Sequence, residues 1–157
     1  MSQSPTQRRR SEPTVPHGAR VVPRCADIPI AVDALVIAFQ PDPCRVRELR
    51  QTAATFLQGA GLREPLASDV VLTVSELVAN AIVHGEGDVK LRIAVADDKV
   101  RVSVTDENPS PAVLKDPGAT RESGRGLRLV DELADVWESL GEETWCEFRY
   151  GTGRDTA

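Results

Sequence analysis

The chain of 157 residues is 41% hydrophobic but only 4% aromatic, and its formal net charge at pH 7 is −5. This length suits one domain with a core of Leu, Val and Ala, and no apolar run reaches the roughly 20 residues of a membrane-spanning helix. An acidic chain is unsuited to a large nucleic-acid footprint, so we expect no nucleic acid as partner. Since no apolar run is long enough to span a bilayer, we also expect no membrane partner and predict a cytoplasmic protein.

The first 30 residues differ in composition from the rest of the chain. They are rich in Ser, Pro, Gln and Arg, and their five arginines oppose only Glu12 and Asp27, so this tail carries +3 and the remainder −8. Such a segment buries too little apolar surface to offset its ordering entropy. We predict a disordered tail over residues 1–30, either solvated or touching an acidic partner, a domain over residues 31–152 and a flexible C-terminus over residues 153–157.

Three elements are predicted in the first half of the domain. Residues 34–40 (ALVIAFQ) form a short apolar run closed by PDP, which indicates a strand. Pro43 begins a helix of about 16 residues that ends at Gly59-Ala60-Gly61. Pro65 begins a second helix, which carries apolar residues at helical spacing and ends at Gly85.

The hydrophobic pattern changes to period two after Gly87. Apolar residues alternate over 89–95 and 100–104 on either side of Asp97-Asp98, which predicts a hairpin with one buried face. Residues 107–125 have the composition of a long functional or mobile loop.

A short helix and a second hairpin complete the predicted domain. The helix covers residues 126–134, and the hairpin joins residues 136–140 to 144–150 around Gly141-Glu142-Glu143. Hairpins covered by helices with one apolar stripe predict an α+β fold, a two-layer sandwich whose sheet is mostly antiparallel.

Cysteine and histidine are too few and too scattered for a metal centre. The cysteines Cys25, Cys44 and Cys146 form no CxxC pair, and the only histidines are His17 and His84. This pattern indicates reduced, mostly buried thiols and excludes a disulfide framework or a multi-histidine site.

Glu76 and Asn80 are the first candidate site residues. They are one turn apart on the second predicted helix, about 40° apart around its axis, so their side chains share a stripe at the edge of the apolar face. A carboxylate there can accept a proton, and an amide oxygen is a hard ligand suited to Mg²⁺. Taken alone, the pair also fits ordinary residues at the boundary of the core.

Two further candidates follow along the chain. Asp106 stands at the exit of a predicted strand, where a carboxylate can accept a hydrogen bond from an exocyclic amine; taken alone, it is better explained by simple turn chemistry. In ESGRGL, Gly124 and Gly126 free the backbone to approach an anion just before a helix, and Arg125 adds positive charge.

Together these residues resemble a known family. ELVANAIVHG looks like the N-box of the GHKL ATP-binding superfamily, Asp106 like its first glycine box and GRGL, which includes Leu127, like its second. The ending DVWESLGEETWCEF is similar to the GHKL anti-sigma-factor serine kinases. The resemblance covers about Leu35 to Tyr150 and implies the Bergerat fold with ATP and Mg²⁺ as ligands.

The resemblance also implies roles for individual residues. Asn80 would hold Mg²⁺ between the phosphates, and Glu76 would be the general base. Asp106 would bind the adenine amine, and Thr144 would support the adenine base through water or through Asp106. Gly124 and Gly126 would contact the phosphates.

Two assignments and one departure stand beside these roles. Arg125 near the phosphates is inferred from its charge alone, and His84 is placed near enough to line the site, although a histidine at a helix end is more often structural. The first glycine box is usually Asp-x-Gly-x-Gly, whereas here Asp106 is followed by Glu107-Asn108-Pro109-Ser110. The missing glycines predict a stiffer, differently shaped approach to adenine.

The function implied by the resemblance is an ATP-dependent protein serine kinase that acts as an anti-sigma regulatory factor. Its expected partners are an STAS-type antagonist protein, phosphorylated on serine, and a sigma factor; homodimerisation is left open. The alternative is a nucleotide-binding regulatory module with little or no kinase activity. A stand-alone histidine-kinase catalytic domain is disfavoured, because no dimerisation helix with a phosphoacceptor histidine precedes it.

Overall fold

The computed structural model describes residues 33–113 and 125–151, except for the side chain of Arg125. The predicted tail over residues 1–30, the predicted C-terminus over residues 153–157 and Gly124 lie outside the described residues. The elements in chain order are β1 (Asp33–Phe39), α1 (Arg45–Gly59), α2 (Leu66–His84), β2 (Val89–Val95), β3 (Lys99–Thr105), α3 (Arg125–Leu133), β4 (Val136–Leu140) and β5 (Glu143–Arg149).

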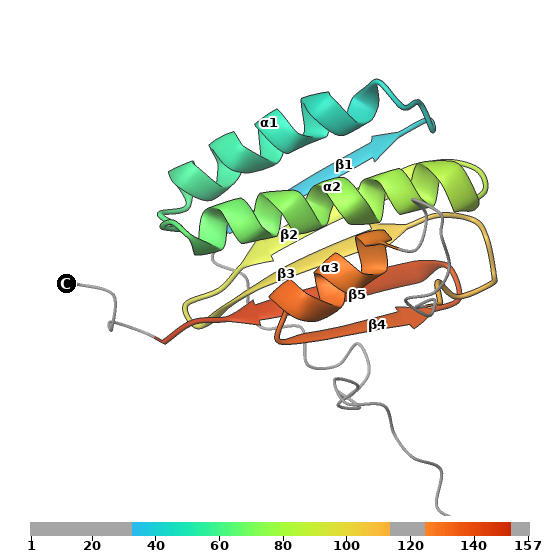
Figure 1. Ribbon diagram of the computed structural model, residues 1–157. Coiled ribbons are helices and arrows are strands. Elements are labelled where there is room, and N and C mark those ends of the chain that lie inside the picture. Colours follow the sequence, from blue (N-terminus) through green and yellow to red (C-terminus); the bar gives the residue numbers. More distant parts are fainter. Residues whose placement is uncertain (1–32, 114–124, 152–157) are drawn as a thin grey trace, which may run out of the picture.

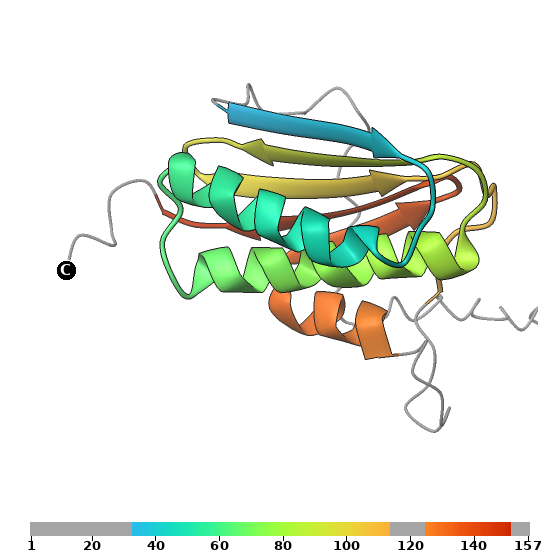
Figure 2. The same ribbon diagram turned by 90° about the horizontal axis from the view of Figure 1, so that it is seen from above.

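The described elements form two layers. The five strands make one sheet in the order β1-β2-β3-β5-β4, and each neighbouring pair is antiparallel. The helices α1, α2 and α3 all lie over the same face of this sheet (Figure 1 and Figure 2). The predicted α+β two-layer sandwich is therefore confirmed.

The core lies between the sheet and the helices. Leu91 of β2 is opposite Val104 of β3, and Ile93 is opposite Val102, so the alternating apolar side chains of both strands point toward the helical layer. These side chains are almost completely buried. Removing a Val or Leu side chain from water contributes about 1.5–3 kcal/mol, so this strip is a major source of stability.

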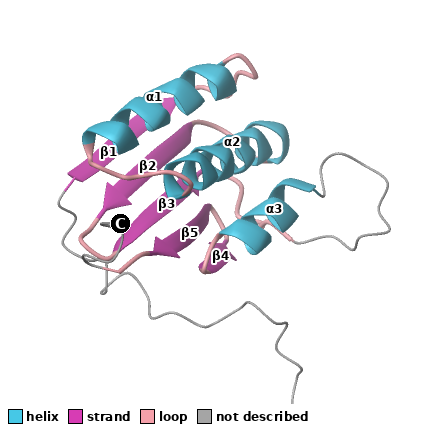
Figure 3. Cartoon of the chain, turned by 60° about the vertical axis from the view of Figure 1, so that its left-hand side comes forward, coloured by secondary structure: helices cyan, strands magenta, loops and turns pink. Residues whose placement is uncertain are grey.

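Helix α2 is the central helix of the layer, between α1 and α3 (Figure 3). Its core-facing side is lined by apolar side chains at helical spacing, namely Val70, Val74, Leu77, Val78 and Ala81. By length and mean hydropathy alone, α2 is the one described helix that would suffice to cross a membrane. A helix packed in a protein core passes the same test, and α2 is packed in this way.

Helix α1 begins two residues later than predicted. The Asp42 carboxylate accepts a hydrogen bond from the Cys44 backbone N–H at 2.9 Å, and the Asp42 carbonyl accepts one from Arg45 at 3.0 Å. These bonds close a turn that contains Pro43, so Pro43 precedes the helix instead of beginning it.

The second hairpin also has a shorter connection than predicted. Leu140 pairs with Glu143, which leaves only Gly141 and Glu142 in the turn. Gly141 has φ of +55°, a backbone conformation that residues with a Cβ rarely adopt, so a glycine is required there.

The face of the sheet opposite the helices contains a buried carboxylate. Glu147 on β5 is only 1% exposed, and its Oε1 lies 3.2 Å from Nη1 of Arg101 and 3.8 Å from Nζ of Lys99. Arg101 also lies over the Trp145 ring, with its Cζ 3.9 Å from the ring centroid. Arg149 is more distant, at 4.0 Å from Oε2, and is half exposed. Arg101 is thus the main partner of both Glu147 and Trp145.

We expect the two arginines to contribute very differently to stability. Arg101→Ala leaves the buried Glu147 charge without its hydrogen-bonded partner and should lower the free energy of unfolding by about 3 kcal/mol. Arg149→Ala removes only a half-exposed cation at the limit of ion-pair distance and should cost about 1 kcal/mol or less. Urea denaturation of both variants measures the difference, and equal losses would contradict the assignment of Arg101 as the main partner.

Candidate functional site

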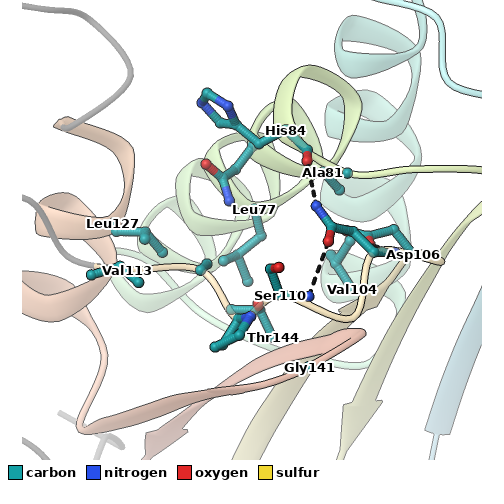
Figure 4. A pocket seen from close by; sticks show the side chains of 15 residues that line it. Leu77, Ala81, His84, Val104, Asp106, Ser110, Val113, Leu127, Gly141 and Thr144 are labelled. Atoms are coloured by element: carbon teal, nitrogen blue, oxygen red, sulfur yellow. Dashed lines mark hydrogen bonds between the residues drawn. The ribbon is translucent and has the colours of Figure 1, made fainter.

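One cavity brings together residues from four parts of the fold. It has a volume of about 240 Å³ and is bounded by the end of α2, the exit of β3 with the segment that follows it, the start of α3 and the β4–β5 hairpin (Figure 4). Five residues predicted from the sequence line it: Asn80, His84, Asp106, Leu127 and Thr144.

Much of the cavity wall is apolar. Leu77 and Ala81 of α2, Val104 of β3 and Leu127 of α3 contribute buried side chains to it. Polar groups are confined to a few positions around these side chains. An apolar wall with a small number of placed polar groups is the usual composition of a small-molecule site, and the flat face of an aromatic base suits it.

Asp106 is held in position by hydrogen bonds at the exit of β3. Its backbone N–H donates to the Glu142 carbonyl at 2.9 Å, and its Oδ1 accepts from the Asn108 backbone N–H at 2.7 Å. Within the described residues, no hydrogen bond reaches Oδ2. The carboxylate therefore keeps one oxygen free to accept a hydrogen bond from a ligand.

Gly85 brings the end of α2 against Asp106. The sequence pattern suggests Gly85 only as a helix end, yet its backbone is extended (φ −77°, ψ 178°), which other residues also adopt. A Cβ at this position would overlap the Ala81 carbonyl and lie 2.6 Å from Oδ2 of Asp106. Space, and not backbone conformation, is the reason for glycine here.

Asn80 and Glu76 border different neighbours. Asn80 is half-buried and lines the cavity, whereas Glu76 is not among its lining residues. A Cβ built on Gly126 would lie 2.7 Å from Oε2 of Glu76, so the carboxylate lies against the backbone of α3. The Gly126 backbone thus adjoins Glu76. Of the two residues that share a stripe of α2, Asn80 faces the cavity and Glu76 faces the contact between α2 and α3.

Thr144 is connected to the cavity wall through a residue that the sequence patterns do not single out. Its Oγ1 lies 2.8 Å from Oγ of Ser139 on the adjacent strand, and the Ser139 hydroxyl also accepts a hydrogen bond from the Ala112 backbone N–H at 2.8 Å. Ser139 therefore links Thr144 to the segment after β3. Its sequence signal is its period-two spacing from Trp137, which packs against the core and shares its face of β4.

The remaining predicted residues contribute less to the described site. His84 has an exposed side chain at the rim, while its backbone carbonyl accepts a hydrogen bond from Asn108. Gly124 and the side chain of Arg125 lie outside the described part of the chain. Within that part, no three His, Cys, Asp or Glu side chains are grouped to hold a metal ion.

The buried cysteine takes no part in this site. Cys146 lies in the core on β5, and burial raises the pKa of its thiol far above the ordinary value. Because the thiolate is the reactive form, Cys146 is an inert core residue.

Comparison with known proteins identifies the type of domain. Residues 39–149 match the family model described as the histidine kinase-like ATPase domain. The chain is also similar in structure to the RsbU and RsbW domains of Rv1364c from Mycobacterium tuberculosis, with a TM-score of 0.54 and 21% sequence identity. That match covers 75% of this chain and 32% of the other, so this chain spans about a third of that protein's length. A search of curated proteins found no match.

The close contact at Gly85 can be tested by adding one methyl group. In Gly85→Ala the new Cβ would meet a backbone carbonyl, which cannot move aside freely, so we expect a loss of about 1–3 kcal/mol in the free energy of unfolding. Gly59→Ala is the control, because a Cβ at the end of α1 would meet nothing within 4 Å. Urea denaturation measures both; a Gly85→Ala protein as stable as the control would refute the close contact.

Proposed function

The chain belongs to the histidine kinase-like ATPase family, and on this premise we propose that it is an ATP-dependent protein serine kinase acting as an anti-sigma regulatory factor. The proposed substrate is a serine of an STAS-type antagonist protein, and the second partner is a sigma factor. The observation that supports the nucleotide site is the partly apolar cavity that Asn80 on α2 and Asp106 at the exit of β3 both line.

The cavity fits an adenine base. Its apolar lining can contact the faces of the ring, and Oδ2 of Asp106 is an acceptor without a partner among the described residues. Gly85 leaves the room that this carboxylate occupies. A carboxylate that accepts from an exocyclic amine favours adenine over a base that presents an oxygen at the same position, because two acceptors cannot pair.

The residues present also fit Mg²⁺, provided that the nucleotide supplies most of its ligands. Asn80 offers one amide oxygen in the cavity, and no carboxylate cluster accompanies it in the described chain. Mg²⁺ commonly takes one or two protein oxygens and completes its octahedron with phosphates and water. When bound there, the ion would neutralise charge on the phosphates.

For phosphoryl transfer, the chain itself would mainly position the groups and remove a proton. Glu76 would accept the proton of the substrate hydroxyl as the serine oxygen bonds to the γ-phosphorus and the bond to ADP breaks. The absence of a side chain at Gly126 lets this carboxylate lie against α3. Thr144 and Ser139 would fix the opposite wall of the cavity.

The partners are proposed from sequence similarity. They rest on the similarity of the C-terminal segment DVWESLGEETWCEF to anti-sigma-factor serine kinases. The similar domains from Mycobacterium tuberculosis are 21% identical to this chain, and that likeness supports the fold alone.

One observation favours the alternative, a nucleotide-binding regulatory module with little or no kinase activity. Glu76 lies beside the cavity and does not line it, although Asn80, one turn later, does. Nucleotide binding needs the cavity, whereas proton removal also needs Glu76 to reach the substrate hydroxyl. The two readings therefore differ in what Glu76 contributes.

Two variants of the stripe distinguish these functions. Asn80→Ala removes the amide oxygen, so Mg²⁺-dependent ATP affinity should fall. Glu76→Gln keeps the shape of the side chain but removes the base, so ATP should still bind while phosphoryl transfer falls by about 10²-fold or more. Calorimetry with ATP and Mg²⁺ measures binding, and transfer of labelled phosphate to candidate STAS proteins measures turnover.

The outcomes separate three interpretations. A Glu76→Gln protein that transfers phosphate at the wild-type rate would end the assignment of Glu76 as general base. Wild-type protein that binds ATP without transferring phosphate to any candidate would favour the binding module. If both changes alter only the melting temperature, the two residues are structural.

A further inference from the structure

Asn108 occupies the position of the first glycine that the Asp-x-Gly-x-Gly pattern would place after Asp106, and it makes three hydrogen bonds there. Its side-chain Nδ2 donates to the His84 carbonyl at 2.9 Å, and its Oδ1 accepts from the Ser110 backbone N–H at 2.9 Å (Figure 4). Its own backbone N–H donates to Oδ1 of Asp106 at 2.7 Å. One residue thus joins the end of α2, the carboxylate of Asp106 and the segment after β3.

Two of these bonds, to the His84 carbonyl and to Oδ1 of Asp106, determine how Asp106 is held. The bond to the His84 carbonyl pairs an acceptor at the C-terminal end of α2 that has no partner within the helix. It also fixes where the Asn108 backbone lies relative to α2, and hence where its N–H meets the Asp106 carboxylate. With Oδ1 engaged in this way, the carboxylate is oriented before any ligand arrives, and Oδ2 remains the available acceptor.

The rest of the segment is fixed in the same way. The Ala112 backbone N–H donates to Oγ of Ser139, and the backbone N–H of Glu107 donates to the Glu86 carbonyl at 2.7 Å. A Cβ on Gly141 would lie 3.3 Å from the Pro109 carbonyl, so the β4–β5 turn closely adjoins the segment. Asn108 and residues 110–113 therefore form a built cavity wall, and the Asn108 side chain connects this wall to α2.

We propose that Asn108 is a positioning residue for adenine recognition. Where the family pattern has a flexible glycine, the Asn108 side chain fixes the backbone beside Asp106. It thereby holds the Asp106 carboxylate in position to accept a hydrogen bond from the exocyclic amine. This inference rests on the proposed ATP site. It goes beyond that site by assigning nucleotide discrimination to a residue that need not touch the nucleotide. Preorganised acceptors discriminate strongly, because a ligand that lacks the donor leaves the acceptor desolvated and unpaired.

The test compares ATP with purine ribonucleoside triphosphate, which lacks only the 6-amino group. Calorimetry with Mg²⁺ should show that the wild-type full chain prefers ATP by about tenfold or more. Asn108→Ala removes the two side-chain hydrogen bonds, so ATP affinity should fall by about tenfold while affinity for the analogue changes little. Asn108→Gly restores the usual glycine, and we nevertheless expect it to lose the preference for ATP as well.

Glu107→Ala is the matched control, because its exposed side chain precedes Asn108 and makes no hydrogen bond within the described residues. It should keep the wild-type preference. Asn108→Ser, with a side chain too short to reach the His84 carbonyl, serves in place of the alanine variant if that variant does not fold. The ratio of the two affinities is the decisive quantity, since a purely structural role would weaken both nucleotides together.

The remaining outcomes overturn the proposal in distinguishable ways. If the Asn108 variants lose affinity equally for ATP and the analogue, or keep the wild-type preference for ATP, positioning by Asn108 is refuted while the ATP site stands. A gain of ATP affinity in Asn108→Gly would show that the asparagine hinders recognition. Wild-type protein that binds neither nucleotide would refute the proposed ATP site, and the inference with it.

Discussion

The arrangement of the site depends on how closely α2 approaches the exit of β3. The Cα of Gly85 lies so near the Asp106 carboxylate and the Ala81 carbonyl that no Cβ can be accommodated. Because β3 is a central strand paired on both sides, its end is fixed relative to the sheet, and this contact in turn fixes the end of α2. The cavity forms beside the contact, with Asp106 at its edge, so its shape follows from a packing constraint and not from a flexible glycine loop.

Apolar packing and hydrogen bonds have different tasks in this domain. The valine and leucine side chains between the sheet and α2 set the distance between the two layers and contribute most of the stability, but they do not orient a carboxylate. Orientation comes from short polar links at the rim, through Asn108, Ser139 and the Glu142 carbonyl. Each link joins a backbone group of the cavity wall to a different element. Such a wall remains in place without ligand, and little ordering entropy then opposes binding.

Local patterns predicted the elements and their layers but not their long-range contacts. Period-two alternation in β2 and β3 and helical spacing in α2 were sufficient for the α+β sandwich, because those patterns state which face is buried. The pairing of β3 with β5, which brings Ser103 opposite Trp145 and buries Glu147 beside Arg101, joins segments about forty residues apart and leaves no periodic signal. Likewise, the sequence indicates only a turn residue at Asn108, because its hydrogen bond to the His84 carbonyl is a long-range contact.

Two residues one helical turn apart can serve separate parts of a reaction because a rotation of about 40° changes which neighbour each side chain meets. Here the rotation places Asn80 in the cavity wall and Glu76 against α3. The described lining of the cavity therefore does not include Glu76, whereas the proposed proton removal by Glu76 depends on how α3 approaches it. Gly126 is the position that controls this approach, since a side chain there would displace the carboxylate. On the proposed function, nucleotide binding and phosphoryl transfer are therefore separable: the first would depend on the packing of α2 against β3 and the second on that of α2 against α3.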